Sequence, residues 1–298
     1  GGGEKATGRT DRAKDAVMRV VVKDLGEAHA ETGVWITPHS DIHNGHPDHN
    51  PVVLQRELDW LGAADNHYGI LAGDMCEMAL KDSVGDVYDQ VVSPQKQAEL
   101  VVTQYTPYKD RLLAACGGNH EARVYRSTGF DPSMIYSSAL GVPYQAEGVL
   151  LVVKFGKRTR KNAAKTRGTT DQSSTYYLYF THGWGAARTV GAKLKNVSEL
   201  RSVVSNADVY IGGHNHQPGW YPLDSYEIGP SKTLGATTIR RTQHFISLGS
   251  ALDYAGYAQV KGMSPTSMLF PRIHLAPYVD QRNMGERNGK HITVVGGS

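Results

Sequence analysis

The stretch Tyr68-Gly69-Ile70-Leu71-Ala72-Gly73-Asp74 is a short apolar run that ends in a glycine and a carboxylate. A run of this length, bounded by turn-forming residues, is typical of a buried strand. The same arrangement recurs four more times along the chain, and a polar cluster follows each run. Buried strands are therefore predicted at residues 34–36, 68–72, 112–115, 176–180 and 207–211.

The polar clusters are rich in histidine, aspartate and asparagine. They are Asp41-Ile42-His43, Gly73-Asp74, Gly118-Asn119-His120-Glu121, Thr181-His182-Gly183 and Gly213-His214-Asn215-His216. In a parallel or mixed sheet, groups at the carboxyl ends of the strands gather in one crevice. The members of two pairs, Asp41 with His43 and His214 with His216, are two residues apart. An extended backbone would point both members of a pair to one face. We therefore expect the five clusters to form a single site.

Helical segments alternate with the expected strands, which indicates an α/β fold. Helices are expected at residues 53–61, 95–105 and 197–204. Further strands are expected at residues 149–155, 175–180, 237–239 and 244–247.

The 298 residues could form one large domain or two small ones. One domain over residues 20–298 is favoured, because the clusters run from Asp41 to His216 without a linker. Residues 1–19 are polar and glycine-rich, so we expect a flexible N-terminal segment that is neither a signal peptide nor a membrane anchor. A basic hairpin insert is expected at about residues 154–172.

The 32 Lys and Arg residues nearly balance the 29 Asp and Glu residues, which leaves a formal charge of +3. A surplus this small does not by itself indicate a nucleic-acid binder. No apolar run approaches the roughly 18 residues that cross a bilayer, so we expect a soluble chain with no membrane partner. Cys76 and Cys116 suit free thiols in the cytoplasm better than a disulfide scaffold, although they could pair if they lie close together.

The insert carries the strongest local charge. From Lys154 to Arg167 it contains no acidic residue, and the candidate substrate contacts in it are Lys157, Arg158, Arg160 and Lys161. One interpretation is a basic arm that contacts the backbone of DNA or RNA, because the arm leads into the strand that ends at His182. The alternative is a solvated loop with no binding role.

Seven side chains in the clusters offer metal ligands. They are Asp41, His43, Asp74, Asn119, His182, His214 and His216. Imidazole, carboxylate and amide oxygen without sulfur suit manganese, zinc, iron or nickel, and manganese is our first expectation. A carboxylate has two oxygens that can bridge two divalent ions, and Gly73 lets the backbone at Asp74 approach closely. We therefore expect a centre of two metal ions that shares Asp74.

Two metals about 3.5 to 4 Å apart can bind a phosphoryl group and lower the pKa of a shared water, so the expected nucleophile is a metal-bound hydroxide. The net positive centre favours an anionic phosphoester as substrate. His120 follows the ligand Asn119 and is suited to protonate the leaving oxygen. The alternative role for His120 is a purely structural contact. Glu121 is expected to be a hydrogen-bonding brace.

The ordered set of motifs resembles that of the calcineurin-like metallophosphoesterases. The overall look of the chain, including Leu248-Gly249-Ser250, is similar to compact bacterial and phage-borne members of this family. The match spans Asp41 to His216. The resemblance implies a four-layer αββα sandwich of two mixed β-sheets flanked by helices. It also implies that His120 is the catalytic histidine. One metal would be held by Asp41, His43, Asp74 and His216, and the other by Asp74, Asn119, His182 and His214.

The chain departs from the protein phosphatases that this family includes. Those enzymes carry Gly-Asp-x-x-Asp-Arg-Gly, whereas this chain has Gly73-Asp74-Met75-Cys76-Glu77-Met78 and lacks the arginine that would hold a phosphomonoester. This favours phosphodiester cleavage, although Arg123 or Arg188 could take the place of the missing arginine. The leading hypothesis is thus a phosphodiesterase of nucleic acid or nucleotides. The alternatives are a phosphomonoesterase of nucleotides or small metabolites, and a non-catalytic interaction subunit on the same fold.

Overall fold

The strands form two six-stranded mixed sheets. The computed structural model describes residues 18–81, 83, 87–156, 173–185, 187, 189–231, 235–260, 262–278 and 290–297. The first sheet has the order β1 (Val20–Asp24), β6 (Val149–Phe155), β7 (Ser174–Thr181), β8 (Val209–Gly212), β10 (Gly235–Ser247), β9 (Gly219–Ser231). The second has the order β12 (Ile292–Gly296), β11 (Pro271–Leu275), β2 (Val34–His39), β3 (His67–Ala72), β4 (Leu112–Cys116), β5 (Tyr144–Gln145).

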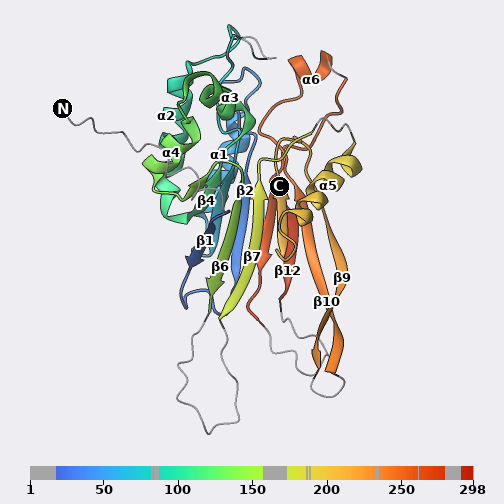
Figure 1. The fold of residues 1–298 in the computed structure, drawn as a ribbon. Coiled ribbons are helices and arrows are strands. Elements are labelled where there is room, and N and C mark those ends of the chain that lie inside the picture. Colours follow the sequence, from blue (N-terminus) through green and yellow to red (C-terminus); the bar gives the residue numbers. More distant parts are fainter. Residues whose placement is uncertain are drawn as a thin grey trace, which may run out of the picture.

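The two sheets pack face to face, and helices cover their outer faces (Figure 1). Side chains from both sheets form the central core, among them Ile36, Ile70, Leu151, Leu178 and Ile246, all fully buried. A second apolar cluster packs α1 (Pro51–Gly62), α2 (Pro94–Tyr105) and α4 (Pro132–Leu140) against the second sheet. A third packs α5 (Val190–Glu199) against the first sheet. The expected four-layer αββα sandwich is confirmed.

A capping side chain and a proline mark the start of α1. The side chain of Asn50 accepts hydrogen bonds from the backbone N–H groups of Val52 and Val53, both at 3.1 Å, and Pro51 occupies the first helical position. The buried face of α1 includes Leu54, Leu58 and Leu61. These leucines lie at helical spacing and pack on the second sheet.

Parallel pairing brings the strand ends with the polar clusters to one end of the sandwich. In the second sheet β2 pairs parallel with β3, and β3 with β4. In the first sheet β7 pairs parallel with β8. Three of the five clusters thus follow strands of one sheet, and the other two follow strands of the other.

Two expectations about element boundaries are wrong. The helix expected at 197–204 is α5, which begins at Val190 and ends at Glu199, and a 3₁₀ turn follows at Leu200–Ser202. Its first two turns carry no buried residue, because Val197 is the only buried position of α5, so no apolar periodicity marked them. The strands expected at 237–239 and 244–247 are parts of one strand, β10, which pairs with β9 along its whole length.

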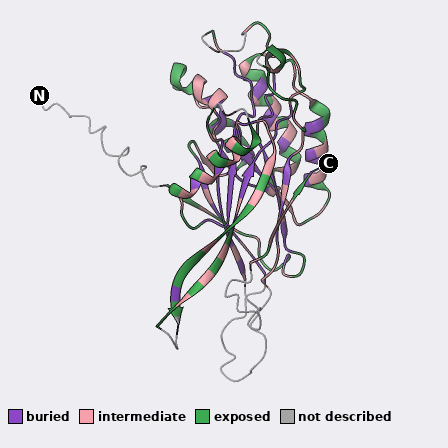
Figure 2. Ribbon diagram, turned by 90° about the vertical axis from the view of Figure 1, so that its right-hand side faces the viewer, coloured by how far each residue is buried: buried purple, intermediate pink, exposed green. Residues whose placement is uncertain are grey.

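The ribbon of β9 and β10 extends beyond the sandwich at the end remote from the helices (Figure 2). The remaining α-helices in the described part of the chain are α3 (Asn119–Thr128) and the short α6 (Gly256–Val260). Among the described residues, no helix is both long and apolar enough to span a bilayer. Cys76 and Cys116 are buried free thiols. The expected N-terminal segment falls outside the described residues except for Met18 and Arg19, and so does the insert from 157 to 172.

Candidate metal centre

The predicted ligands meet between the two sheets in overlapping groups. Donor atoms of Asp41, His43 and His216 lie within 4.8 Å of one another, and the same holds for Asp74, His182 and His214. A further group joins His43, Asp74 and His120. Asp74 therefore belongs to both sides of the site, as expected for a shared ligand.

The first group surrounds one oxygen of Asp41. His216 Nε2 lies 2.9 Å from Asp41 Oδ1, and His43 Nε2 lies 3.9 Å from it. The Nε2 atoms of His43 and His216 are 3.4 Å apart. The other carboxylate oxygen of Asp41, Oδ2, accepts hydrogen bonds from the hydroxyl of Ser40 at 2.6 Å and from the backbone N–H of His214 at 3.0 Å.

The second group surrounds the amide oxygen of Asn119. This Oδ1 lies 2.8 Å from His182 Nε2 and 2.7 Å from His214 Nδ1. His182 Nε2 is also 3.0 Å from Asp74 Oδ2, and His43 Nε2 reaches the same oxygen from the other side at 4.0 Å. All seven predicted ligands are thus brought together.

Asp74 presents one oxygen to both groups, whereas we expected one oxygen for each metal. Its Oδ1 accepts a hydrogen bond from the backbone N–H of His120 at 2.9 Å, because α3 begins directly against this carboxylate. Only Oδ2 faces the histidines. Oδ2 is therefore the atom of Asp74 that histidines from both groups approach.

The ring nitrogens that point away from the centre are held by acceptors. His182 Nδ1 donates to the carbonyl oxygen of Ala72 at 3.0 Å, His43 Nδ1 to Glu77 Oε2 at 2.9 Å, and His214 Nε2 to the carbonyl of Gly185 at 3.0 Å. These bonds fix the rings and turn the opposite nitrogen toward the centre, as in metal-binding histidines.

This arrangement fits metal ions. His214 Nδ1 and Asn119 Oδ1 are two acceptors only 2.7 Å apart, and Asp41 Oδ1 is buried without a hydrogen bond. Such crowding of lone pairs is unfavourable unless a cation lies between them. Neighbouring ligand atoms at bond lengths near 2.1 Å would lie about 3 Å apart on one metal, close to the distances found here.

The carboxylates make the centre strongly attractive to cations. Burial raises the pKa of Asp41, but His216 and His182 outweigh it and bring that pKa down to about 2. Burial lowers the pKa of His182, yet Asp74 and Asp41 raise it to about 10. Without metal the carboxylates therefore hold a proton on His182, and a divalent ion would replace that proton.

The backbone at the ligands is left-handed, so the expectation of an extended backbone is wrong. The φ angles are 54° at Asp41, 52° at His43, 51° at Asp74, 65° at His214 and 53° at His216. Residues other than glycine adopt this region at a cost of about 1 kcal/mol or more each. Members of each pair converge because tight turns direct them inward.

Two glycines allow the close approach of β3 and β4 at Asp74. A Cβ atom on Gly73, whose φ is +85°, would lie 2.7 Å from the carbonyl oxygen of Gly117. A Cβ atom on Gly118 would lie 2.2 Å from Asp74 Oδ1. Gly73 therefore has the role expected from the sequence.

His120 projects into the site from the first turn of α3. Its Nε2 lies 3.8 Å from Asp74 Oδ2, and its Nδ1 donates to the backbone carbonyl of Glu77 at 2.6 Å. The free nitrogen, Nε2, thus faces the two groups of ligands. Burial lowers the pKa of His120, but Asp74 and Glu77 raise it to about 8.

Glu77 is a candidate functional residue that we did not predict. Its Oε2 lies 2.9 Å from His43 Nδ1 and 3.3 Å from His120 Nδ1, and its side chain is buried. Burial raises the pKa of Glu77, but hydrogen bonds from His120 and His43 hold that pKa well below its ordinary value. A carboxylate three residues after Asp74 was the signal in the sequence.

Glu121 braces the loop that carries Asp74. It accepts hydrogen bonds from the backbone N–H groups of Asp74 at 3.2 Å and Cys76 at 3.0 Å. Burial and the nearby Asp74 raise the pKa of Glu121 to about 7. This contact is the hydrogen-bonding role expected for it.

Among the predicted substrate contacts, only Arg123 is described. It lies on α3, one helical turn after His120, and is partly exposed. Arg188, Lys157, Arg158, Arg160 and Lys161 lie outside the described residues. The base of the basic insert is at Phe155 and Ser174, which pair with each other. It is separated from His182 by the whole of β7, roughly 25 Å of extended chain.

Two other histidines near the first clusters face away from the ligands. His39 is fully buried and its Nδ1 bonds to the hydroxyl of Tyr105 at 2.8 Å. His67 Nδ1 donates to the carbonyl of Trp60 at 2.7 Å. Neither is a ligand candidate.

Comparisons with known proteins give only loose likenesses. No protein-family model matches the chain, and a search of the curated proteins gave no match. Among solved structures, the chain is similar to Yfce, a phosphoesterase from E. coli, with 14% identity and a TM-score of 0.36 over 88% of this chain and 98% of that one. It is also similar to Vps29 of Chaetomium thermophilum, with 10% identity and a TM-score of 0.35 over 89% and 96% of the two chains.

At these TM-scores the likenesses decide neither fold nor function. The chain's own features carry the resemblance to the calcineurin-like metallophosphoesterases. This resemblance covers both the ordered sequence motifs and the four-layer sandwich of two mixed sheets.

Proposed function

We propose that this chain is a phosphodiesterase that depends on two divalent metal ions and acts on nucleic acid or nucleotides. One observation carries the proposal: two groups of donor atoms meet at a single oxygen of Asp74. Asp41, His43 and His216 would hold one ion, Asn119, His182 and His214 the other, with Asp74 shared. Manganese is the first metal to test, with zinc, iron and nickel as alternatives.

Bound metals would supply a Lewis acid for the phosphoryl oxygens and activate a water for attack. The chain's own residues would manage the proton on the leaving group. His120 presents Nε2 to the site while Glu77 holds its Nδ1, so a proton on Nε2 is aimed at the position where a leaving oxygen would develop charge. Arg123 would contact a nonbridging oxygen of the phosphate.

The residues after Asp74 support a diester over a monoester. In the position where a phosphatase of this family carries arginine, Met78 is buried, and its backbone N–H bonds to Gln97 Oε1 at 2.8 Å. A second negative charge on a monoester would therefore find no cation there. A diester carries only one negative charge and needs no such partner.

The nucleic-acid part of the proposal rests on the basic insert. Because its base lies at the far end of β7, the insert would contact a long polymer away from the cleaved bond. Replacing Lys157, Arg158, Arg160 and Lys161 by neutral residues should then flatten the salt dependence of binding to single-stranded DNA. An unchanged slope removes the insert from the proposal. The free buried thiols support a cytoplasmic location.

Hydrolysis of bis(p-nitrophenyl) phosphate with added Mn²⁺ tests the activity. Asp74→Asn and His214→Ala should each lower kcat/KM by at least a hundredfold, because each removes a donor that converges on the site. The exposed residues Asp110 and His291 supply matched controls, Asp110→Asn and His291→Ala, which should retain wild-type rates.

Three outcomes would count against the proposal. Activity that survives both site substitutions would reject the metal centre as the catalyst. Faster cleavage of p-nitrophenyl phosphate than of the diester would select the phosphomonoesterase. A purified protein that binds no divalent metal would favour a non-catalytic interaction subunit. A panel of single-stranded DNA, duplex DNA, RNA and cyclic dinucleotides, run with several metals, would then identify the substrate.

A further inference from the structure

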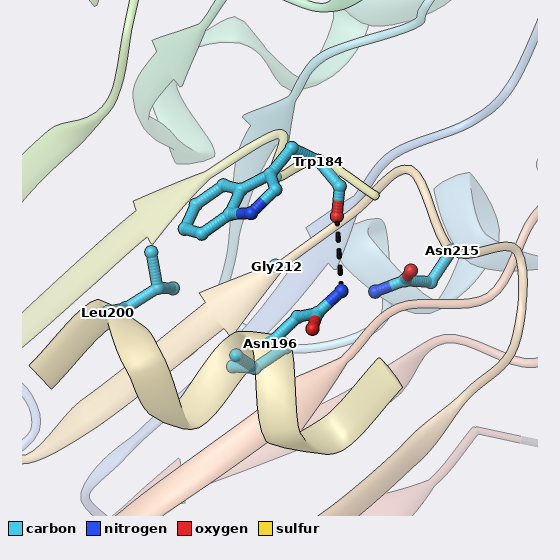
Figure 3. A pocket seen from close by; sticks show the side chains of 7 residues that line it. Trp184, Asn196, Leu200, Gly212 and Asn215 are labelled. Carbon is cyan, nitrogen blue, oxygen red and sulfur yellow. Dashed lines mark hydrogen bonds between the residues drawn. The ribbon is translucent and has the colours of Figure 1, made fainter. Parts of the chain in front are cut away.

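Helix α5 lies against both of the ligand-bearing loops of the first sheet. One loop follows β7 and carries His182, and the other follows β8 and carries His214 and His216. One small pocket is lined by Gly183, Trp184 and Asn215 of the two loops, by Asn196 and Val197 of α5, by Leu200 just after α5 and by Gly212 at the end of β8 (Figure 3). The helix is therefore placed to set the position of these loops.

Two side chains of α5, one helical turn apart, donate to the loops. Lys193 Nζ donates to the backbone carbonyl of Asn215 at 2.6 Å. Asn196 Nδ2 donates to the backbone carbonyl of Trp184 at 3.5 Å, a longer and weaker bond (Figure 3). Lys193 thus makes the firmer of the two contacts.

The residue that Lys193 holds lies between two ligands. His214 and His216 flank Asn215, and both have left-handed backbone, with φ of 65° and 53°. The N–H of Asn215 bonds to the carbonyl of Gly213 at 2.7 Å, so the turn is tight. On its other side, Ser247 Oγ donates to the carbonyl of Gln217 at 3.0 Å. The turn is therefore held from α5 and from β10.

Lys193 is half-buried, which is costly for an ammonium group. Burial lowers the pKa of Lys193, and the nearby carboxylate of Asp41 opposes this effect. A charge-assisted bond to a carbonyl oxygen offsets part of this cost. An apolar side chain would fill the same space without the cost, so the polar contact is what distinguishes lysine here.

We propose that Lys193 is a positioning residue for the metal centre and holds the turn from His214 to His216 in its metal-binding shape. This inference rests on the metal centre of the proposed function. It assigns Lys193 no contact with the substrate. Its effect should therefore be on the binding of metal, before any chemistry takes place.

The test is calorimetric titration of the metal-free protein with Mn²⁺. Lys193→Met should weaken Mn²⁺ binding by about tenfold, the usual loss when a group that orients a ligand is removed. The matched control is Lys195→Met, because Lys195 is an exposed lysine on the same helix, and it should bind as wild type does. In the Co²⁺-loaded protein, Lys193→Met should also change the visible absorption spectrum, which reports ligand geometry.

Lys193→Gln provides a second variant in case the methionine variant does not fold. Its side chain is one bond shorter and cannot reach the carbonyl, so the same loss of affinity is expected. Wild-type affinity and spectrum in either folded variant would overturn the inference, and so would an increase in KM without a loss of Mn²⁺ affinity. A wild-type protein that binds no metal would instead defeat the proposed function itself.

Discussion

At the scale of single residues, Glu77 is the residue whose role follows most directly from contacts. Its carboxylate faces Nδ1 of His43, a predicted ligand, and Nδ1 of His120, the predicted acid. A carboxylate can accept a hydrogen bond from both rings, whereas an amide can accept through only one of its two atoms. Glu77 therefore connects the candidate metal centre to the proposed proton donor.

Glu77→Gln should lower kcat/KM for a phosphodiester by about 10- to 100-fold. Asp74 and Glu77 raise the pKa of His120, so loss of the Glu77 charge should lower that pKa. A general acid must be protonated to act, and the alkaline limb of the pH–rate profile should therefore move to lower pH. The control is Glu99→Gln on the exposed face of α2. An alkaline limb that stays in place would show that Glu77 does not act through His120.

At this scale the sequence predicted the candidate ligands that the structure brings together, because their chemistry is carried by residue type. A histidine, aspartate or asparagine that follows an apolar run indicates a candidate metal ligand wherever it occurs in the chain. The sequence did not reveal the left-handed backbone conformation at Asp41 or His214, because only glycine is a strong marker of positive φ, and aspartate and histidine are merely enriched there. Glu77 was also missed, since its partners are 34 and 43 residues away in the chain.

At the scale of elements, the ends of β3 and β4 must approach closely for Asp74 to reach the site. Gly73→Ala should destabilise the protein by about 2 to 4 kcal/mol in urea denaturation, because strained φ is combined with a clash against the carbonyl of Gly117. Gly141→Ala is the matched control. Its φ is +69° and its Cβ would meet nothing within 4 Å, so only the cost of about 1 kcal/mol for φ is expected. Equal losses in the two variants would show that close approach at Gly73 is unimportant.

Elements with strong apolar patterns were predicted, and elements without them were not. The strand expected at 149–155 is β6, with the same boundaries, since five of its seven residues are buried. Helix α3 was missed because only Glu121 and Val124 are buried in it, which is too few for an apolar stripe. Helix α4 was missed although its signals are present: Asp131 caps it, Pro132 follows, and Gly141 ends it.

At the scale of the whole molecule, pairing between distant strands decides the architecture. The order β1-β6-β7-β8-β10-β9 joins segments far apart in sequence, and local patterns do not encode which strands become neighbours. The two sheets were therefore an implication of the family resemblance, whereas the individual strands were predictions from the residues. The base of the basic insert is another example, because the separation of Phe155 and Ser174 from His182 follows from the direction of β6 and β7 and not from a local pattern.

The site joins the two sheets, so metal should stabilise the entire sandwich. Asp41, Asp74 and Asn119 follow strands of the second sheet, while His182 and His214 follow strands of the first. Ions shared between these residues would crosslink the sheets in the folded protein and have no comparable site in the unfolded chain. With Mn²⁺ at 100 times Kd, each site would add about 2.7 kcal/mol to the free energy of unfolding.

Removal of metal with EDTA should therefore lower Tm by about 5 to 10 °C for two sites, and Mn²⁺ should restore it in proportion to the logarithm of its concentration. Differential scanning calorimetry measures this shift. In Asp74→Asn the shift should be largely lost, because the donors that meet at Oδ2 then face a neutral amide. Asp110→Asn should keep it. A Tm that does not respond to Mn²⁺ in the wild-type protein would mean that the two sheets are not bridged by metal.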